Sequence, residues 1–379
     1  MKITKSLKIA VAAIALTLFA TQSASAAVNL TGAGSTFAIP LLDSCKAGFA
    51  VTTGNSFTYT GGGSGAGRAA SDKGINDFNI SDTPHTGATR LPSVIHIPVF
   101  AAPIAIMYNL PIRQTLNLSP ATVAGIFAGT ITKWNDKAIV ADNNRSYQTV
   151  DYKKNANGDV IKDKKGQPIV LRTRTVKTHL TMPNQKIQVV YRSDSSGTSG
   201  NFTNFLHGMA PSVWPKAGNG DFKTSFPGNI NDLSNLGRIV AAAGSSGVAA
   251  LAGKTRYSIT YSEANYAKAA GLNVANIKNA AGNYQAPDAG GTSAFLGSST
   301  YDPNGWLTFD YNTTNPGAYP LGIVSYVLVD TKTKNAEAVK SLLSYILDPK
   351  CPGTDPSLEY TTITGALHDF DVKQIAKIG

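Results

Sequence analysis

Cysteine, histidine and charged residues are all scarce in this sequence of 379 residues, which has two cysteines, five histidines and only 15% charged residues. Two cysteines cannot form the disulfide framework of a small secreted domain or a four-cysteine zinc site. The histidines show no metal-binding spacing, such as a pair one helical turn apart. Apolar residues make up 42% of the chain, so a hydrophobic core must stabilise the fold, and the length indicates two domains.

No stretch after the N-terminal segment is long and apolar enough to span a bilayer. Residues 9–20 form an apolar stretch that follows three lysines and precedes the small-residue sequence Ala24-Ser25-Ala26. This order is typical of a secretory signal peptide over residues 1–26. The alternative, a membrane anchor, needs about 18 uninterrupted apolar residues. We therefore expect the mature chain to begin near Ala27 and to lie in a periplasm or another extracytoplasmic space.

Acidic residues are also few, because 34 lysines and arginines face only 23 aspartates and glutamates. Removal of the signal peptide lowers the formal net charge from +11 to +8, which favours anionic partners. Nucleic acid is not expected among them, because the chain is exported and has no basic helix interleaved with aromatic residues. In an oxidising compartment Cys45 and Cys351 could pair, which would join the two ends of the chain.

Much of the positive charge lies in one segment, residues 142–180, which holds nine basic residues against four acidic ones. Turn signals at Asn157-Gly158 and Lys165-Gly166 separate β-prone runs, and residues 171–176 alternate in polarity. This pattern predicts a protruding basic β-ribbon. Either the ribbon is a solvated surface element, or it docks to an acidic partner or to the cell surface.

Strand-like and helix-like runs alternate along the remainder of the chain. β-branched and aromatic residues concentrate in residues 57–59, 79–80, 95–108, 187–191, 257–261 and 323–329. Helical periodicity is clearest over residues 335–347, and it is weaker over 39–49, 120–127, 199–207 and 262–270. This alternation predicts α/β layers with largely parallel sheets.

Three strand-to-helix turns in this pattern carry groups that bind anions. They are residues 32–37, residues 61–65 and residues 191–199. Backbone amides at a helix start can donate to an oxyanion, and so can nearby serine and threonine hydroxyls. A single glycine-rich turn of this kind can also be only a tight connection between a strand and a helix, without a ligand. Together, the three turns predict an oxyanion site at the carboxyl ends of their strands.

Charged side chains refine this prediction. Arg192 can bind an oxyanion through two parallel hydrogen bonds, and Asp194 can hold the guanidinium in place. A carboxylate, Asp82, stands in a further polar turn. Phosphate near neutral pH keeps a proton that a buried carboxylate can accept, whereas sulfate has none and would leave that carboxylate unpaired. Asp82 is therefore either a selectivity residue or an aspartate that closes the turn before Pro84.

These motifs together resemble a known family. They are similar to motifs of the periplasmic phosphate-binding proteins of the high-affinity phosphate uptake system. The matching segments, which agree in order and spacing, are residues 31–37, 61–64, 81–82, 129–139 and 192–198. It extends over most of residues 28–379. The resemblance implies an α/β fold of the two-lobed periplasmic binding type (type II-like), with mixed sheets flanked by helices. It also implies that phosphate lies in the cleft between the lobes and that the lobes close by a hinge motion.

The resemblance further implies a role for each matching residue. The residues implied to bind phosphate are Thr36, Phe37, Ser64, Asp82, Arg192, Ser196, Gly197 and Thr198, and Asp194 is implied as a supporting residue. In this scheme Asp82 accepts the phosphate proton, Arg192 supplies positive charge, and Asp194 is the partner of Arg192. The others donate hydrogen bonds from backbone amides and hydroxyls.

The topology of the family implies the lobe boundaries. Residues 27–107 and 323–379 would form the first lobe, and residues 108–322 would form the second, including the basic ribbon at about 142–180. Both cysteines then fall in the first lobe, which allows a disulfide without requiring one.

Two positions depart from the family pattern. Gly65 follows Ser64 where the family commonly has a second serine, so one supporting hydroxyl is absent. Arg68 lies one helical turn further on, and it either adds positive charge at the rim of the cleft or is an ordinary surface arginine.

The expected function is extracytoplasmic solute binding by a monomer that needs no cofactor or metal. It would deliver inorganic phosphate to the membrane permease subunits of an ABC transporter. Sulfate, molybdate and phosphonate remain alternative ligands, and surface adhesion is an alternative function. Catalysis is not expected, because the near-match to a nucleophile elbow at residues 61–65 has Gly63 at its centre, and Ser64 is flanked by glycine rather than by a base.

Overall fold

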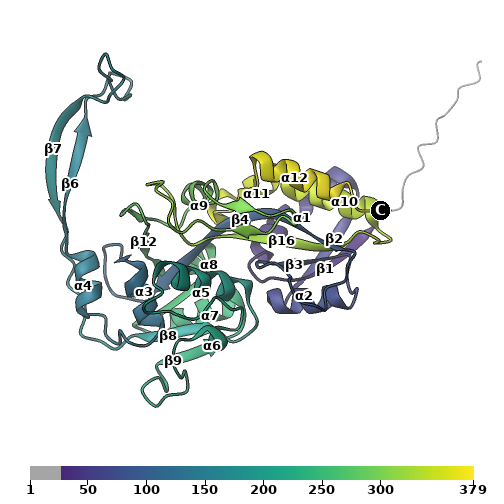
Figure 1. Ribbon diagram of the computed structural model, residues 1–379, viewed down its shortest axis with the longest axis horizontal. Helices are drawn as coiled ribbons and strands as arrows, with labels where there is room; N and C mark the ends of the chain where they lie inside the picture. The colour runs from purple at the N-terminus through teal and green to yellow at the C-terminus, as the bar shows by residue number, and fades with distance from the viewer. Residues whose placement is uncertain (1–26) are drawn as a thin grey trace, which may run out of the picture.

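A computed structural model describes residues 27–379, so the expected signal peptide at 1–26 lies outside the described residues. Figure 1 shows a body of two α/β halves, from one of which a long hairpin projects. In the described part of the chain, no helix is both long and apolar enough to cross a membrane.

A single mixed sheet runs through both halves, with its strands in the order β2-β1-β3-β16-β4-β10-β8-β9. Their bounds are β1 (Asn29–Gly34), β2 (Ser56–Gly61), β3 (Phe78–Ser81), β4 (Val94–Tyr108), β8 (Gln188–Arg192), β9 (Ile239–Ala242), β10 (Ser258–Glu263) and β16 (Gly322–Asp330). β1 pairs in parallel with β2 and β3, and β8 pairs in parallel with β9 and β10. β16 and β10 both run antiparallel to β4. The expected parallel pairs are therefore present in each half, whereas the strands that join the halves are antiparallel.

The long strand β4 connects the two halves of the sheet. Its residues 94–103 pair with β16, and its residues 104–108 pair with β10. Nearly every side chain of β4 is buried, so its sequence is a continuous apolar run rather than an alternating one. This is the pattern of a strand covered on both faces. The α/β fold with mixed sheets that the resemblance implies is confirmed, whereas the largely parallel sheets expected from the alternation of elements are not found, because β4 and β16 pair antiparallel with their neighbours.

Helices of the first half come from both ends of the chain. They are α1 (Ile39–Thr53), α2 (Ser64–Asp72), α10 (Ala336–Leu347), α11 (Lys350–Gly353) and α12 (Gly365–Ile375). The periodicity of residues 335–347 is explained by α10, which buries its apolar face against the core. Cys45 in α1 and Cys351 in α11 are joined by a disulfide bond, so the two ends of the chain meet as the sequence allowed.

Between residues 108 and 322 the helices are α3 (Pro120–Phe127), α4 (Lys137–Asn143), α5 (Gly197–Met209), α6 (Phe222–Ser225), α7 (Gly244–Lys254), α8 (Ala264–Ala270) and α9 (Ala289–Leu296). The core of this half is aromatic, with Phe202 stacked on Tyr261 at 4.2 Å between ring centroids. Two helices differ from the expected starts. α5 begins earlier, because Ser196 caps it, and α8 begins later, because β10 continues to Glu263.

Shorter elements complete the chain. The short strands are β5 (Asn117–Leu118), β11 (Asn273–Val274), β12 (Asn276–Lys278), β13 (Tyr284–Gln285), β14 (Thr300–Tyr301), β15 (Leu307–Thr308) and β17 (Thr361–Thr362), and a 3-10 turn covers Pro356–Leu358. The predicted ribbon is present as β6 (Ser146–Tyr152) and β7 (Val170–Lys177), which pair only with each other.

Candidate functional site

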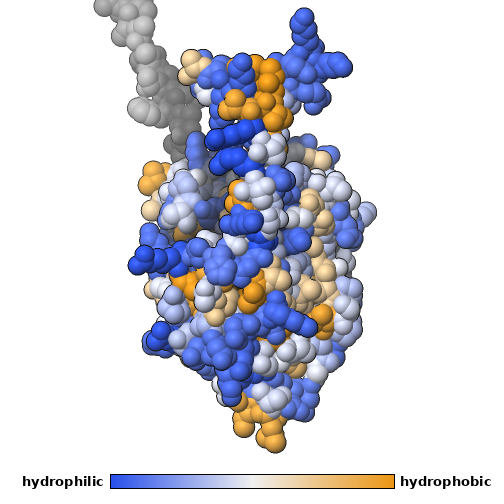
Figure 2. Space-filling model, turned by 90° about the vertical axis from the view of Figure 1, so that its left-hand side faces the viewer, coloured by the Kyte–Doolittle hydropathy of each residue, from blue (hydrophilic) through white to orange (hydrophobic). Residues whose placement is uncertain are grey.

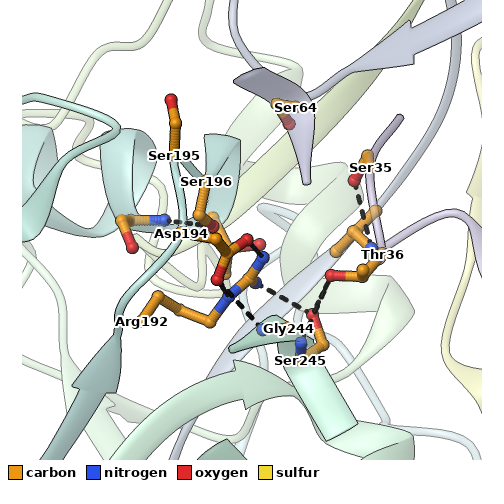
Figure 3. Close-up of polar contacts among 12 residues, drawn as sticks. Ser35, Thr36, Ser64, Arg192, Asp194, Ser195, Ser196, Gly244 and Ser245 are labelled. Atoms are coloured by element: carbon orange, nitrogen blue, oxygen red, sulfur yellow. Dashed lines mark hydrogen bonds and ion pairs between the residues drawn. The ribbon is translucent and has the colours of Figure 1, made fainter. Parts of the chain in front are cut away.

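The turns after β1, β2 and β8, which the sequence singled out, lie together with the turn after β9 (Figure 3). β1 and β2 are parallel neighbours, and so are β8 and β9, so the carboxyl ends within each pair lie at one edge. Helices α1, α2, α5 and α7 begin close after these strand ends. Since the N-terminus of a helix carries partial positive charge, this region is suited to an anion.

Asp82 is the buried acceptor of the site, with only 2% of its surface exposed. Its Oδ2 accepts hydrogen bonds from Ser35 Oγ at 2.5 Å and Ser64 Oγ at 3.0 Å, and its Oδ1 accepts from Ser325 Oγ at 2.7 Å. Burial raises the pKa of this carboxyl, although the serine hydrogen bonds and the charge of Arg192 counteract part of the rise. Each carboxylate oxygen can accept two hydrogen bonds, so Oδ1 has room for one more donor.

Arg192 is the buried positive charge. Its Nε and Nη2 donate to the two oxygens of Asp194 at 2.8 and 2.5 Å, and its Nη1 donates to Ser245 Oγ at 3.1 Å. Burial lowers the pKa of Arg192, but Asp194, Glu263 and Tyr261 together raise it above its ordinary value, so the guanidinium stays charged. Burial raises the pKa of Asp194, but the bonds from Arg192 leave it below its ordinary value. The predicted pairing of Arg192 with Asp194 is therefore present, and it fixes the plane of the guanidinium.

The turn after β1 reaches both halves of the molecule. The Thr36 hydroxyl lies 3.0 Å from Ser245 Oγ and accepts a hydrogen bond from the Ser245 amide at 3.2 Å. The Phe37 amide donates to Ser35 Oγ at 3.0 Å, and the Phe37 side chain is fully buried. The Phe37 carbonyl accepts a hydrogen bond from the hydroxyl of Tyr360. Thr36 therefore contacts the second half directly, whereas Phe37 anchors the turn in the core of the first.

The start of α5 brings Ser196, Gly197 and Thr198 to the site. Ser196 Oγ caps the helix by accepting from the Ser199 amide at 3.1 Å, and Ser196 N donates to a carbonyl of its own half. Thr198 Oγ1 donates to Glu263 Oε1 at 3.2 Å. The first amides of a helix have no acceptor within the helix, so the backbone amides of Gly197 and Thr198, at the start of α5, can donate to a ligand. The Ser196 hydroxyl proton is also left to donate.

The two halves touch each other across the site. The Gly65 amide donates to the Ser195 carbonyl at 2.9 Å. A Cβ at Gly65 would lie 2.4 Å from Ser195 Cβ, and one at Gly63 would lie 2.5 Å from Asp194 Oδ2. Gly63 also has a φ of +84°, in the region that favours glycine. Glycine at position 65 thus makes room for Ser195, and the two halves are in contact at this point.

Arg68 is tied into the rim of the cleft and is not an ordinary surface residue. Its Nη1 donates to Ser81 Oγ and Thr83 Oγ1, both at 2.9 Å, and its Nη2 lies 3.4 Å from Ser195 Oγ in the other half. Partial burial lowers the pKa of Arg68, an effect that the nearby carboxylates reduce. Arg68 therefore adds positive charge beside the contact between the halves.

Sequence reasoning assigned no role to four polar residues of the site, which are Ser35, Ser245, Glu263 and Ser325. Two of them carried a usable signal, because Ser35 lies inside the first glycine-rich turn and Ser245 follows β9 at the start of α7. Glu263 and Ser325 lie in strands without a local motif. They reach the site only because β10 and β16 flank β4, which no local pattern reveals.

Glu263 is a second buried carboxyl, with 1% of its surface exposed. It accepts hydrogen bonds from Thr198 Oγ1 at 3.2 Å and Ser262 Oγ at 2.9 Å. Burial raises its pKa, and the charge of Arg192 limits the rise. Glu263 thereby orients the first turn of α5.

Solvent reaches the edge of the site through a cleft of about 680 Å³ beside Asp82. Its walls include Asn201, Asn204, Trp306 and Tyr311. Within residues 27–379, no three histidine, cysteine, aspartate or glutamate side chains are grouped as a metal site would require.

Comparisons with known proteins identify the family. Residues 20–350 match the PBP superfamily domain. The phosphate-binding protein PstS3 of Mycobacterium bovis is 31% identical over 308 residues, which cover 76% of this chain and 70% of the relative. The phosphate-binding protein PstS of Xylella fastidiosa is 29% identical over 329 residues, which cover 84% of this chain and 76% of the relative.

A solved structure agrees at the level of the fold. A high affinity periplasmic phosphate-binding protein, bound with phosphate, superposes with a TM-score of 0.65 at 21% identity, covering 92% of this chain and 93% of the other. The two-lobed α/β fold expected from the sequence is thereby confirmed. The chain belongs to the family of phosphate-binding proteins within the PBP superfamily.

Proposed function

We propose that this protein captures inorganic phosphate in the cleft between its lobes and delivers it to an ABC transporter. The observation that carries the proposal is the placement of a buried carboxyl, Asp82, among the hydroxyls and helix starts that surround the guanidinium of Arg192. The names of the relatives, all phosphate-binding proteins, support it.

In this proposal the ligand is held from both lobes. Its direct contacts are Thr36, Phe37, Ser64, Asp82, Arg192, Ser196, Gly197 and Thr198, with Asp194 as the residue that positions Arg192. Amides, hydroxyls and the guanidinium stabilise the charge of the ligand. Asp82 accepts the proton that phosphate keeps near neutral pH.

This combination selects against fully ionised anions. Sulfate presents only acceptor oxygens, so one of them would face the Asp82 carboxylate without a proton between them. Leaving a buried acceptor unsatisfied costs about 1 to 3 kcal/mol, and more for a charged group. A phosphonate carries an organic group in place of one oxygen, and the contact between Gly65 and Ser195 leaves little room for it.

We assign residues 27–107 and 323–379 to the first lobe and residues 108–322 to the second. The change of pairing partner along β4 near residue 104 supports this division. Release of the ligand then requires the lobes to separate, which breaks the contacts that Thr36 and Gly65 make with the second lobe. Phosphate binding and closure are therefore coupled.

The remaining assignments follow from the same function. The mature protein acts as a monomer outside the cytoplasm, and its macromolecular partners are the permease subunits of the transporter. It is a carrier rather than an enzyme, because Ser35, Ser64 and Ser325 share the single carboxylate of Asp82 and none has a base of its own.

Calorimetric titration of the phosphate-stripped protein tests the proposal. We expect tight one-to-one binding of phosphate by the wild type. Arg192→Ala removes the buried positive charge, so its affinity should fall at least about a hundredfold. Circular dichroism and the melting temperature establish that the variant is folded.

Arg113→Ala is the matched control, because Arg113 is exposed and lies outside the site. Its affinity should equal that of the wild type. If Arg192→Ala, while folded, binds phosphate as tightly as Arg113→Ala does, the proposed site is wrong.

A further inference from the structure

The ribbon formed by β6 and β7 stands apart from the body of the molecule (Figure 1). A two-stranded hairpin without a covering layer is only marginally stable in water. Its shaft is reinforced by Asp151, which accepts hydrogen bonds from Arg172 at 2.6 Å and from Arg174 at 2.9 Å across the strands. The carboxylate of Asp151 is therefore paired with arginines of the ribbon itself.

The tip of the ribbon, residues 153–169, consists of two consecutive turns of the same construction. Asn155 Oδ1 accepts from the amides of residues 157 and 159, and Asp163 Oδ1 accepts from the amides of residues 165 and 167. Gly158 and Gly166 adopt φ values of +91° and +79° at equivalent positions. Both carboxylates of the tip thus take part in the turns, since Asp163 holds the second turn and Asp159 Oδ2 accepts from Asn155 Nδ2 at 3.1 Å in the first.

Five lysines project from this tip, at positions 153, 154, 162, 164 and 165. All five are exposed, and among residues 27–379 none forms an ion pair with a carboxylate. The two aspartates of the tip leave a net positive charge concentrated at the end of the ribbon.

Apolar side chains lie next to these lysines. Val170 and Leu171 are 54% and 64% exposed, and Val150 and Tyr152 are also exposed. Val150 lies opposite Thr173 and Tyr152 lies opposite Val170, with a β-bulge between Asp151 and Tyr152. In Figure 2 the ribbon rises above the body, and a hydrophobic patch there is bordered by strongly hydrophilic side chains.

We propose that the ribbon tip docks the protein onto an anionic lipid bilayer. Exposed apolar side chains bordered by lysines match the interface of such a bilayer, where lysines attract headgroups and apolar groups enter the outer acyl region. Tyrosine is enriched at the same depth. Protein interfaces, in contrast, are depleted in lysine, so a lysine-rich tip favours a lipid surface over a protein partner.

Such docking leaves the ligand cleft free. The ribbon lies between α4 and β8 in the sequence, and none of its residues lines the cleft beside Asp82. The inference goes beyond phosphate binding and does not depend on it. A protein held at a membrane by its ribbon would remain able to bind and release its ligand.

Vesicle flotation of the mature protein tests the proposal. Vesicles of phosphatidylcholine with about 30% phosphatidylglycerol should retain the wild type at about 0.15 M salt, whereas pure phosphatidylcholine should not. Replacement of the five tip lysines by glutamine should lower the partition coefficient at least about tenfold. Leu171→Ser should weaken binding as well, but with little change in its salt dependence.

The matched control replaces five exposed lysines of the body by glutamine, namely Lys216, Lys254, Lys268, Lys332 and Lys373. It has the same net charge as the tip variant, and it should bind the anionic vesicles like the wild type. A Tyr152→Trp reporter should show a blue-shifted emission with anionic vesicles only.

Equal loss in the body variant would overturn the proposal, as would equal binding to both kinds of vesicle or to neither. Ribbon-dependent association that appears only in membranes containing the transporter would also overturn it, in favour of a protein partner. Phosphate affinity, measured in parallel, should be unchanged in every variant, so failure here is distinguishable from failure of the ligand site.

Discussion

At the scale of single residues, the site depends on two buried charges that have separate partners. Asp82 is surrounded by serine hydroxyls of the first half, and Arg192 is held by Asp194 and Ser245 of the second. Neither charge is neutralised by direct contact with the other. A ligand that accepts from Arg192 and donates to Asp82 would satisfy both.

Asp82→Asn should reduce the discrimination of phosphate from sulfate. The amide that replaces the carboxylate can donate to a sulfate oxygen, and it no longer repels the anion. We expect the ratio of the two affinities to fall at least about tenfold in competitive calorimetry. Asp43→Asn, at an exposed position of α1, serves as the control and should keep the ratio of the wild type. If the ratio is unchanged in Asp82→Asn, Asp82 only closes its turn and does not discriminate phosphate from sulfate.

Gly65→Ala should impair closure rather than folding. The added Cβ would lie 2.4 Å from Ser195 Cβ in the closed arrangement, so the halves could not approach as they do here. Alanine in the first turn of α2 is compatible with the helix, so the melting temperature without ligand should not fall. We expect phosphate affinity to drop at least about tenfold. Gly353→Ala, where a Cβ meets nothing within 4 Å, should bind normally.

Asp371 in α12 should make the protein less stable as the pH rises. Its carboxyl oxygens are buried without a hydrogen-bond partner, and burial raises its pKa to about 9. The folded state therefore holds a proton that the unfolded state loses near pH 4, so stability falls between about pH 4 and pH 9.

Asp371→Asn removes this titration. We expect the variant to melt several degrees higher than the wild type at pH 8 and at nearly the same temperature at pH 4. Asp369→Asn, at an exposed position of the same helix, should follow the wild type at both pH values. A difference between Asp371→Asn and the wild type that does not change with pH would contradict the assigned pKa shift.

At the scale of elements, the sequence predicted the parts that have a local pattern. The amphipathic face of α10, the apolar run of β4 and the ribbon were all predicted, because periodicity and turn residues determine them. α5 begins two residues before the predicted helix, because Ser196 is the N-cap of the helix. The antiparallel pairing of β4 with β16 was not predicted from periodicity, because strand order depends on contacts distant in sequence.

The disulfide between α1 and α11 should stabilise the first half without affecting the ligand. It closes a loop with a sequence separation of 306, so it restricts the unfolded chain strongly. We expect the double variant Cys45→Ser, Cys351→Ser to lose about 2 to 4 kcal/mol in denaturant unfolding. A reducing agent should lower the stability of the wild type to that of the variant, and it should leave the variant unchanged. Equal stability of the oxidised wild type and the variant would contradict this role.

At the scale of the whole molecule, the site exists only where the two halves of the sheet meet. Motifs predicted which turns could bind an anion, and parallel pairing explains why turns within one half lie together. The contact between Gly65 and Ser195, and the arrival of Ser325 at Asp82, depend on how the halves pack. No local pattern encodes that packing, so these residues could be identified only from the structure.

The measurement that tests the central claim most directly is competition for labelled phosphate on the stripped wild-type protein near neutral pH. We predict that one equivalent of unlabelled phosphate per chain displaces half of the label and a large excess displaces nearly all of it, whereas a large excess of sulfate or molybdate leaves the label bound. Displacement of the label by sulfate at concentrations similar to those of phosphate would contradict the account, because Asp82 would then not distinguish a protonated anion from an unprotonated one.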